Sequence, residues 1–137
     1  MGKIKSRQIA PQFISDSVGS VYGRAKGDLP GGSLVVVTGS FSGTFVIETA
    51  SNQSIRRSSG LLYVIDHLCL GGNTAIAKPF HVLPYSGDKK VKDGDAVWLG
   101  RDGHWTLNKP KTRPIQVGRI LVNEKSVEVL LAPQGRY

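Results

Sequence analysis

The sequence predicts an all-β fold, a two-sheet β-sandwich or jelly roll of about eight strands with an extended N-terminal arm. From Leu34 onward, short runs rich in β-branched and aromatic residues are separated by Gly, Pro, Asn and Asp, while helical periodicity is nearly absent. The chain has 137 residues, enough for one domain with its own hydrophobic core. About eight runs in roughly 105 residues fit two sheets better than a five-stranded barrel.

Residues 1–30 are expected to form a basic, extended arm, followed by the β domain over residues 31–137. In this segment glycines and prolines interrupt every short apolar stretch, so little apolar surface is available to offset the entropy of ordering. An ordinary frayed terminus is the alternative interpretation. The charged residues of the segment are mostly cationic: Lys3, Lys5, Arg7, Arg24 and Lys26, against Asp16 and Asp28.

The first half of the β domain predicts a hairpin and a buried strand. Residues 34–38 form a continuous β-branched run, and residues 44–49 form a second run after a short Gly-containing turn, so the two are expected to pair. Residues 61–67 are apolar on both faces for most of their length, which is typical of a buried central strand.

Two further hairpins are predicted in the second half. Residues 96–99 and 104–107 flank a turn that we expect to be type I with a left-handed Gly103. Residues 116–122 and 126–131 surround a three-residue turn and show clean alternation of apolar and polar positions. Between the hairpins, residues 109–114 contain two prolines and must form a loop or an edge.

The sequence predicts no enzyme and no catalytic, metal or cofactor-binding residues. Asp66 and His67 are adjacent, so in a strand they point to opposite faces, and Cys69 between two leucines is typical of a core thiol. The three histidines have no metal-binding spacing, and there is no second cysteine. No glycine pair precedes a predicted helix that would hold a phosphate.

A formal net charge of +8 predicts an acidic partner. Charge alone does not distinguish between nucleic acid, an anionic membrane and the acidic surface of another protein. No apolar run approaches the roughly 20 residues of a membrane helix, and no signal region is recognisable, so we expect no membrane partner. Basic runs at residues 56–57, 89–92 and 109–113, with Trp98 and Trp105 nearby, leave open a nucleic-acid-binding β-barrel module that uses basic loops. Core tryptophans are the competing interpretation, and a solvent-exposed tryptophan would instead suit carbohydrate binding.

The C-terminal part of the chain resembles the small capsid decoration, or cement, proteins of tailed bacteriophages. The residues that carry the resemblance are Gly94-Asp95-Ala96-Val97, Gly103 with Thr106, Val117-Gly118-Arg119-Ile120 and the closing Val127-Leu131 strand. The resemblance implies a β-sandwich that binds the outer surface of an assembled capsid, bridges major capsid protein subunits and stabilises the head. It also implies a dimer or trimer at a capsid symmetry axis and a place on the virion exterior after synthesis in the host cytoplasm.

Capsid contacts are expected from the arm first and from loops second. Lys3, Lys5 and Arg7 would hold the arm on an acidic surface, and Ile4 and Ile9 would add apolar anchors. An arm that orders on binding suits a repetitive lattice, because many weak contacts act together. The loop candidates are Arg56, Arg57, Lys111 and Arg113.

Overall fold

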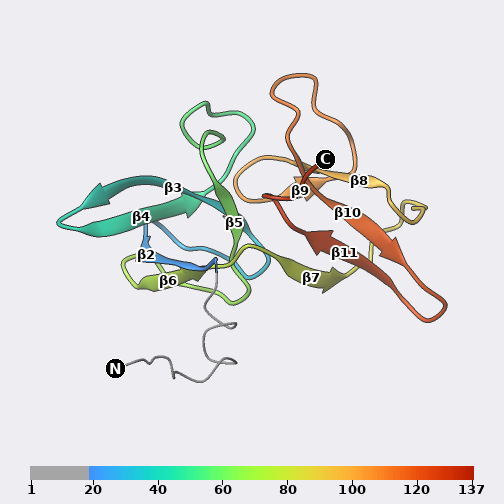
Figure 1. Cartoon of the computed structure of the whole chain (residues 1–137), viewed down its shortest axis with the longest axis horizontal. Helices are drawn as coiled ribbons and strands as arrows, with labels where there is room; N and C mark the ends of the chain where they lie inside the picture. The colour runs from blue at the N-terminus through green and yellow to red at the C-terminus, as the bar shows by residue number, and fades with distance from the viewer. Residues whose placement is uncertain (1–18) are drawn as a thin grey trace, which may run out of the picture.

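The computed structural model describes residues 19–137, which form ten strands in two five-stranded sheets (Figure 1). The all-β, two-sheet prediction is therefore confirmed, with ten strands in place of about eight. The strands are β2 (Val21–Ala25), β3 (Leu34–Phe41), β4 (Thr44–Thr49), β5 (Leu62–Val64), β6 (Thr74–Ala77), β7 (His81–Pro84), β8 (Ala96–Leu99), β9 (Trp105–Thr106), β10 (Gln116–Val122) and β11 (Val127–Leu131).

The first sheet has the order β5-β3-β4-β2-β6 and curls until its edges meet. Strands β2 and β4 run parallel, and the other pairs are antiparallel. At the closing edge the Val64 and Lys78 backbones exchange hydrogen bonds, with N···O distances of 2.7 and 2.8 Å. Closure leaves β5 and β6 without long free edges, which protects them from pairing with other chains.

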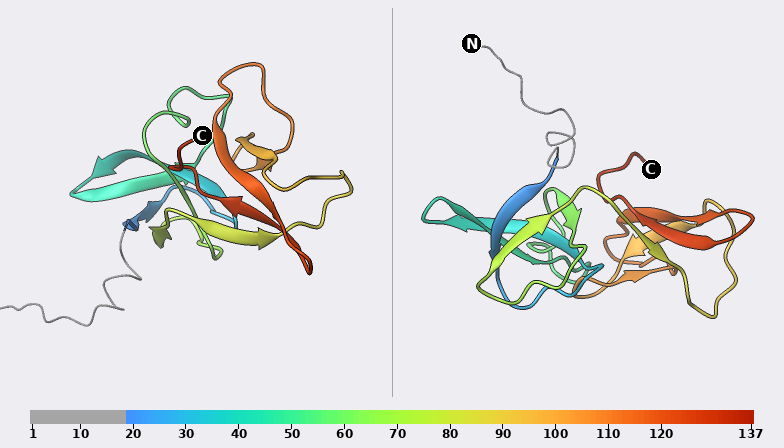
Figure 2. Two further views of the ribbon diagram at one scale, coloured as in Figure 1. Left: turned by 45° about the vertical axis from the view of Figure 1, so that its right-hand side comes forward. Right: turned by 90° about the horizontal axis from the view of Figure 1, so that it is seen from below.

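The second sheet has the order β7-β11-β10-β8-β9 and is antiparallel throughout. Each sheet comes from one continuous part of the chain. In Figure 1 the first sheet lies on the left and the second sheet on the right, and Figure 2 shows the molecule from two further directions. Strand β10 carries a bulge between Gln116 and Gly118. A side chain at Gly118 would collide with the carbonyl oxygen of Leu130, so this position needs glycine.

Two hydrophobic clusters follow from the alternation of side chains along β3. Leu34 and Val36 belong to the cluster between the two sheets, while Val35 and Val37 contribute to a second cluster inside the curled first sheet. Strand β5 divides in the same way, with Leu62 and Val64 on one face and Tyr63 on the other. This explains why the run at residues 61–67 is apolar on both faces. The run was expected to form a central strand, but β5 has only three residues and ends the sheet order.

The boundary expected at residue 30 is corrected by the structure, because residues 21–29 belong to the folded domain. Strand β2 pairs with both β4 and β6, and Leu29 is fully buried and pairs with Cys69. Gly23 does not interrupt this strand. It allows β4 to approach closely, since a Cβ there would lie 2.8 Å from the Phe45 carbonyl oxygen. The remainder of the predicted arm, residues 1–18, lies outside the described residues.

The three predicted hairpins are confirmed, and one turn differs from its prediction. Between β8 and β9, both Asp102 and Gly103 have positive φ, at 47° and 87°, and the His104 N–H donates to the Arg101 carbonyl at 2.9 Å. The turn thus contains two residues and resembles the type I′ hairpin turn that Asp-Gly favours, in place of a type I turn. Residues 109–114 form a loop, as expected.

This β8–β9 turn joins the two halves of the molecule. The Leu34 N–H donates to the Gly103 carbonyl at 2.9 Å, and the Gly103 N–H donates to the Ala50 carbonyl at 2.6 Å. A Cβ at Gly103 would lie 3.2 Å from a Thr49 methyl carbon, so the turn fits closely against the end of β4. The two sheets are therefore connected by backbone hydrogen bonds as well as by the shared core.

Candidate interaction surface

Two basic loops that are separate in the sequence lie side by side in the structure. The Lys89 ammonium, from the loop before β8, donates to the side-chain oxygen of Asn108 at 3.0 Å, in the loop after β9. The first loop is itself held by the Tyr85 hydroxyl, which donates to the Lys89 carbonyl at 2.7 Å. The β7–β8 and β9–β10 loops thus form one positively charged surface.

Trp98 lies at the centre of this surface. The Lys109 ammonium sits 5.2 Å from the centre of the Trp98 ring, a distance at which a cation is attracted to the ring face. Lys89, Lys90 and Trp98 also line a cleft of about 160 Å³. We call Lys89, Lys90, Trp98 and Lys109 the Trp98 basic patch.

The Trp98 basic patch has a chemistry suited to anionic groups. The acid that lines its cleft, Asp95, has one carboxylate oxygen engaged by the Lys92 backbone N–H at 2.8 Å. Three ammonium groups beside one half-buried indole can bind carboxylates of an acidic protein surface or phosphates of a nucleic acid.

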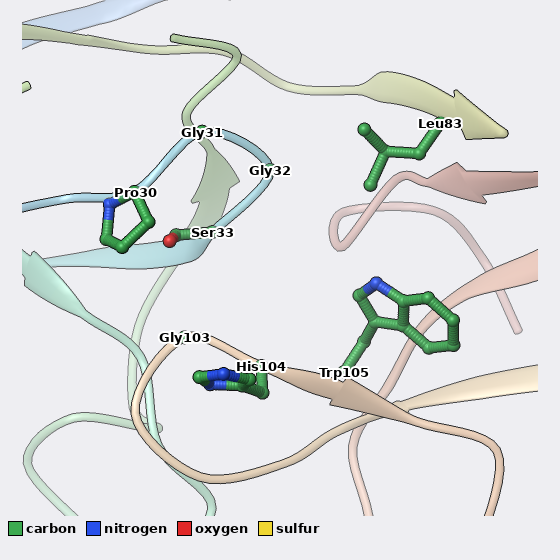
Figure 3. Close-up of a pocket in the computed structure, with 8 residues that line it drawn as sticks. All are labelled: Pro30, Gly31, Gly32, Ser33, Leu83, Gly103, His104 and Trp105. Atoms are coloured by element: carbon green, nitrogen blue, oxygen red, sulfur yellow. The ribbon is translucent and has the colours of Figure 1, made fainter. Parts of the chain in front are cut away.

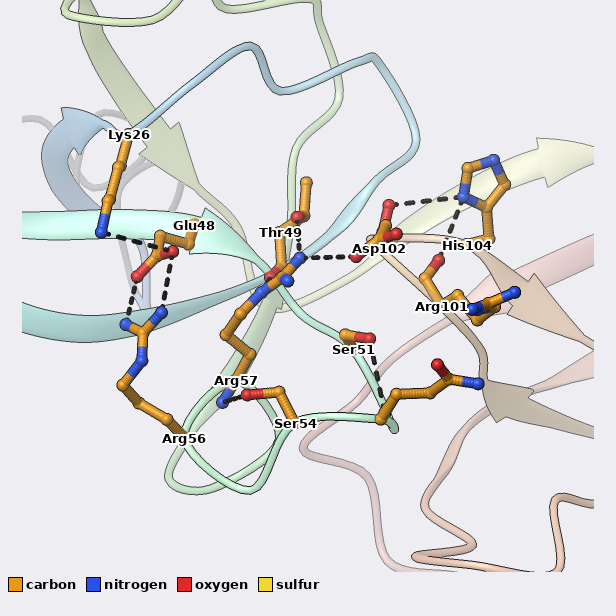
Figure 4. Close-up of polar contacts among 11 residues, drawn as sticks. Lys26, Glu48, Thr49, Ser51, Ser54, Arg56, Arg57, Arg101, Asp102 and His104 are labelled. Carbon is orange, nitrogen blue, oxygen red and sulfur yellow. Dashed lines mark hydrogen bonds and ion pairs between the residues drawn. The ribbon is translucent and has the colours of Figure 1, made fainter.

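Arg57 and Arg113, two of the predicted loop contacts, hold the fold together. Arg57 donates to the Thr49 carbonyl at 2.9 Å, to the Thr49 hydroxyl at 2.6 Å and to Asp102 at 2.9 Å (Figure 4). Arg113, with a φ of 50°, donates to the Asn52 carbonyl at 2.7 Å. Both guanidinium groups therefore connect the two halves of the molecule. Arg57 forms an ion pair with Asp102, and Arg113 donates a hydrogen bond to a backbone carbonyl.

Arg56 has an internal partner as well. Its guanidinium group lies 2.5 Å from the Glu48 carboxylate (Figure 4). The same carboxylate also accepts a hydrogen bond from the Thr38 hydroxyl at 2.5 Å. The hydrogen bond from Arg56 outweighs the effect of burial, and together with Thr38 and Lys26 it lowers the pKa of Glu48. With 55% of its side chain exposed, Arg56 still presents an edge to solvent.

Lys111 is the one predicted loop contact for which residues 19–137 provide no hydrogen bond or ion pair, and its side chain is exposed. The predicted arm contacts Lys3, Ile4, Lys5, Arg7 and Ile9 lie outside the described residues. From the sequence alone, Lys89, Lys90 and Lys109 are candidates only for contacts to nucleic acid. Nothing in the sequence shows that the two loops that carry them meet around Trp98.

The residues considered for catalysis come together only in part. Asp66 and His67 follow β5 in a bend, so their side chains meet at 3.0 Å, contrary to the opposite faces expected for a strand. Cys69 stays apart from them and directs its thiol to the Thr74 carbonyl at 3.5 Å. Asp66 also pairs with Lys78 at 2.6 Å. Burial opposes ionisation of Asp66, but the contacts to Lys78 and His67 prevail and lower its pKa to about 2.

Within residues 19–137 there is no group of three or more His, Cys, Asp or Glu side chains that could hold a metal ion. The same part of the chain contains no helix long and apolar enough to cross a membrane.

Comparison with protein-family models and with curated proteins finds no match for the sequence. Among solved structures, the chain is similar to the head fiber gp8.5 N base of bacteriophage phi29, with a TM-score of 0.52 and 18% sequence identity. The superposition covers 86% of this chain and 97% of that chain. At this level of identity the likeness establishes a shared fold.

Proposed function

We propose that this protein is a structural component of a phage head that binds the outer surface of the assembled capsid and bridges major capsid protein subunits. The observation that carries the structural role in a phage head is the fold shared with a phage head fiber base, over 86% of this chain and 97% of that chain. The resemblance of the C-terminal part of the chain to capsid decoration proteins supports the finer role, which is binding to the outer surface and bridging of capsid subunits. In this proposal the protein acts by binding and is not an enzyme.

The binding mode that we propose uses positive charge in two places. The Trp98 basic patch provides a fixed set of ammonium groups, and Lys3, Lys5 and Arg7, with Ile4 and Ile9, provide a second set near the N-terminus. Exposed Lys111 extends the fixed set along the β9–β10 loop. Two linked sites bind a repetitive lattice more tightly than either site alone, because the second contact becomes intramolecular.

Self-association at a capsid symmetry axis belongs to the same proposal. The terminal strands β7 and β9 of the second sheet have one edge each without a paired strand among the described residues. Such edges can pair across a two-fold or three-fold axis. The protein would then be a dimer or trimer on the virion exterior after its synthesis in the host cytoplasm.

Cosedimentation with empty capsids of its own phage tests this function. We expect saturable binding at a fixed ratio to capsid subunits. Replacing Lys3, Lys5 and Arg7 by Gln should weaken binding while the thermal unfolding of residues 19–137 stays nearly unchanged. A protein that stays in the supernatant at both low and moderate salt contradicts the proposal.

A nucleic-acid-binding role is the second candidate, favoured by the meeting of two basic loops around Trp98. A protein that neutralises several phosphates loses orders of magnitude in DNA affinity between about 50 and 200 mM salt. A measured affinity with that steep dependence, combined with no binding to capsids, would favour this second role. A flat or absent response to DNA would exclude it.

A further inference from the structure

A pocket separate from the Trp98 basic patch lies where the two sheets meet. It is lined by the β2–β3 loop, by Leu83 of β7 and by the beginning of β9, and its volume is about 400 Å³ (Figure 3). We call it the junction pocket; its lining residues are Pro30, Gly31, Gly32, Ser33, Leu83, Gly103, His104 and Trp105. Its volume falls within the range of small-molecule sites, roughly 300–1,000 Å³.

A second pocket of about 520 Å³ shares the lining residues His104 and Trp105 with the junction pocket, and we call these two residues the ridge. The second pocket is lined by neutral polar and charged groups from Asn52, Gln53, Arg101, Asp102 and Thr106. One of them, Asn52, has a buried side-chain oxygen without a hydrogen-bond donor in the part of the chain that the structure describes. A ligand that crosses the ridge would therefore meet first a pocket without Lys, Arg, Asp or Glu side chains and then a pocket in which more of the lining side chains are polar or charged.

The polar groups of the ridge are oriented by local contacts. His104 Nδ1 lies 3.1 and 3.3 Å from the carbonyl oxygens of Arg101 and Asp102, which only accept hydrogen bonds. In the neutral ring the proton is therefore on Nδ1, and Nε2 is left as an acceptor. The Trp105 indole turns the edge that carries Nε1 toward the pocket (Figure 3), and within residues 19–137 this N–H has no hydrogen-bond acceptor. The ridge thus offers one acceptor and one donor.

The chemistry of the junction pocket selects against anions and against purely apolar ligands. No Lys, Arg, Asp or Glu lines it, while Pro30, Leu83 and the indole supply apolar surface. Gly31 and Gly32 of the β2–β3 loop add backbone without side chains to the pocket wall. The Gly32 N–H donates to the Ile65 carbonyl at 2.6 Å, and a Cβ at Gly32 would lie 3.3 Å from Leu83. A neutral ligand with an apolar face and polar edges fits this surface.

We propose that the two pockets form a binding site for a neutral saccharide, with one pyranose ring in the junction pocket and its neighbour across the ridge. The apolar C–H groups of a pyranose ring match the apolar surface of Pro30 and Leu83, and its edge hydroxyls match the Trp105 N–H donor and the His104 acceptor. Neutral polar groups in the second pocket match the hydroxyls of the next sugar unit. This site shares no residue with the Trp98 basic patch and does not depend on capsid binding.

The test is a titration of the full-length, ¹⁵N-labelled protein with chitotriose, cellotriose and maltotriose, followed by NMR. At least one sugar should shift the Trp105 indole N–H and the amides of Gly31, Gly32 and Gly103 in a saturable manner, with a Kd on the order of 1 mM. Shifts that saturate elsewhere on the protein, or no saturable shift with any of the three sugars up to about 20 mM, would overturn the proposal.

Variants of the two tryptophans provide the matched comparison. Trp105→Ala should weaken binding about tenfold or more, and Trp98→Ala should leave it unchanged, because Trp98 lies outside both pockets. Since Trp105 also packs against the core, Trp105→Phe provides a variant that keeps an aromatic face but lacks the N–H, and it should bind with intermediate affinity. Equal binding by the wild-type, Trp105→Phe and Trp105→Ala proteins would contradict the site.

Discussion

At the scale of single residues, internal contacts decide which cations are free to bind a partner. Arg57 and Arg113 resemble solvent-exposed loop charges in the sequence, yet their partners Asp102 and Asn52 lie 45 and 61 residues away along the chain. Lys89 and Lys109 instead meet around Trp98 with their charge directed to the surface. We therefore assign the fixed positive surface to these lysines and a structural role to the two arginines.

Gly118 is the residue for which the structure predicts the most severe effect of adding one methyl group. A Cβ there would collide with the backbone of Leu130 on the paired strand, and backbone has little freedom to move. Gly118→Ala should lower the free energy of unfolding by about 2 kcal/mol or more, measured by urea denaturation. Gly39→Ala is the control, since nothing lies within 4 Å of a Cβ at that position. Equal stability of the two variants would contradict the described packing of β10 against β11.

At the scale of elements, β2 is the strand that the sequence did not predict. Its five residues contain a glycine and lie in a segment rich in Gly and Pro, which favoured an arm over a strand. The strand forms because Gly23 permits close contact with β4 and because its other edge pairs with β6. Such pairing depends on residues far along the chain. By contrast, the three hairpins were predictable because their pairing is local and their turns carry Gly or Asn.

The closure of the first sheet predicts a dependence of stability on pH. Asp66, after β5, pairs with Lys78, after β6, directly beside the Val64–Lys78 backbone bridge. The pKa of Asp66 is about 2 in the folded protein, below its ordinary value of 3.8. The ionised carboxylate therefore stabilises the folded protein fully above pH 4, and this stabilisation is lost as the pH falls from 4 to 2. Because 18% of the Asp66 side chain is exposed, solvent screens the ion pair in part. We therefore expect the ion pair to contribute about 1 kcal/mol to the free energy of unfolding.

Asp66→Asn removes this titrating group. The difference in unfolding free energy between pH 5 and pH 2.5 should therefore be about 1 kcal/mol smaller in the variant than in the wild type, as measured by urea denaturation at each pH. The lowered pKa of Glu48 adds loss of stability on acidification in both proteins, so it cancels in the comparison. Asp88→Asn, at an exposed loop position, should behave as the wild type. An unchanged pH dependence in Asp66→Asn would show that the ion pair does not stabilise the closed sheet.

At the scale of the whole molecule, the sequence indicated the class of fold but not the arrangement of its parts. Alternation and turn residues predict strands, whereas the division into a curled first sheet and an open second sheet depends on contacts between distant strands. The same limit applies to the candidate site. The basic runs were visible in the sequence, but their meeting around Trp98 and the pockets beside Trp105 arise only when the halves are joined.

The charge of the Trp98 basic patch should determine how strongly the protein binds capsids. Replacing Lys89, Lys90 and Lys109 by Gln should weaken cosedimentation roughly tenfold at low salt and reduce its sensitivity to salt. A matched variant replaces Arg24, Lys125 and Arg136, three exposed cations elsewhere, and changes the net charge equally. If both variants lose the same affinity, overall charge and not the patch directs binding.

The most direct measurement of the central claim is electron cryo-microscopy of capsids of its own phage after incubation with the protein. We expect added density at one type of lattice position on the outer surface, fitted by the two-sheet fold, in contact with more than one capsid subunit and with the Trp98 basic patch directed toward the shell. Capsids that show no added density at saturating protein concentration would contradict the account.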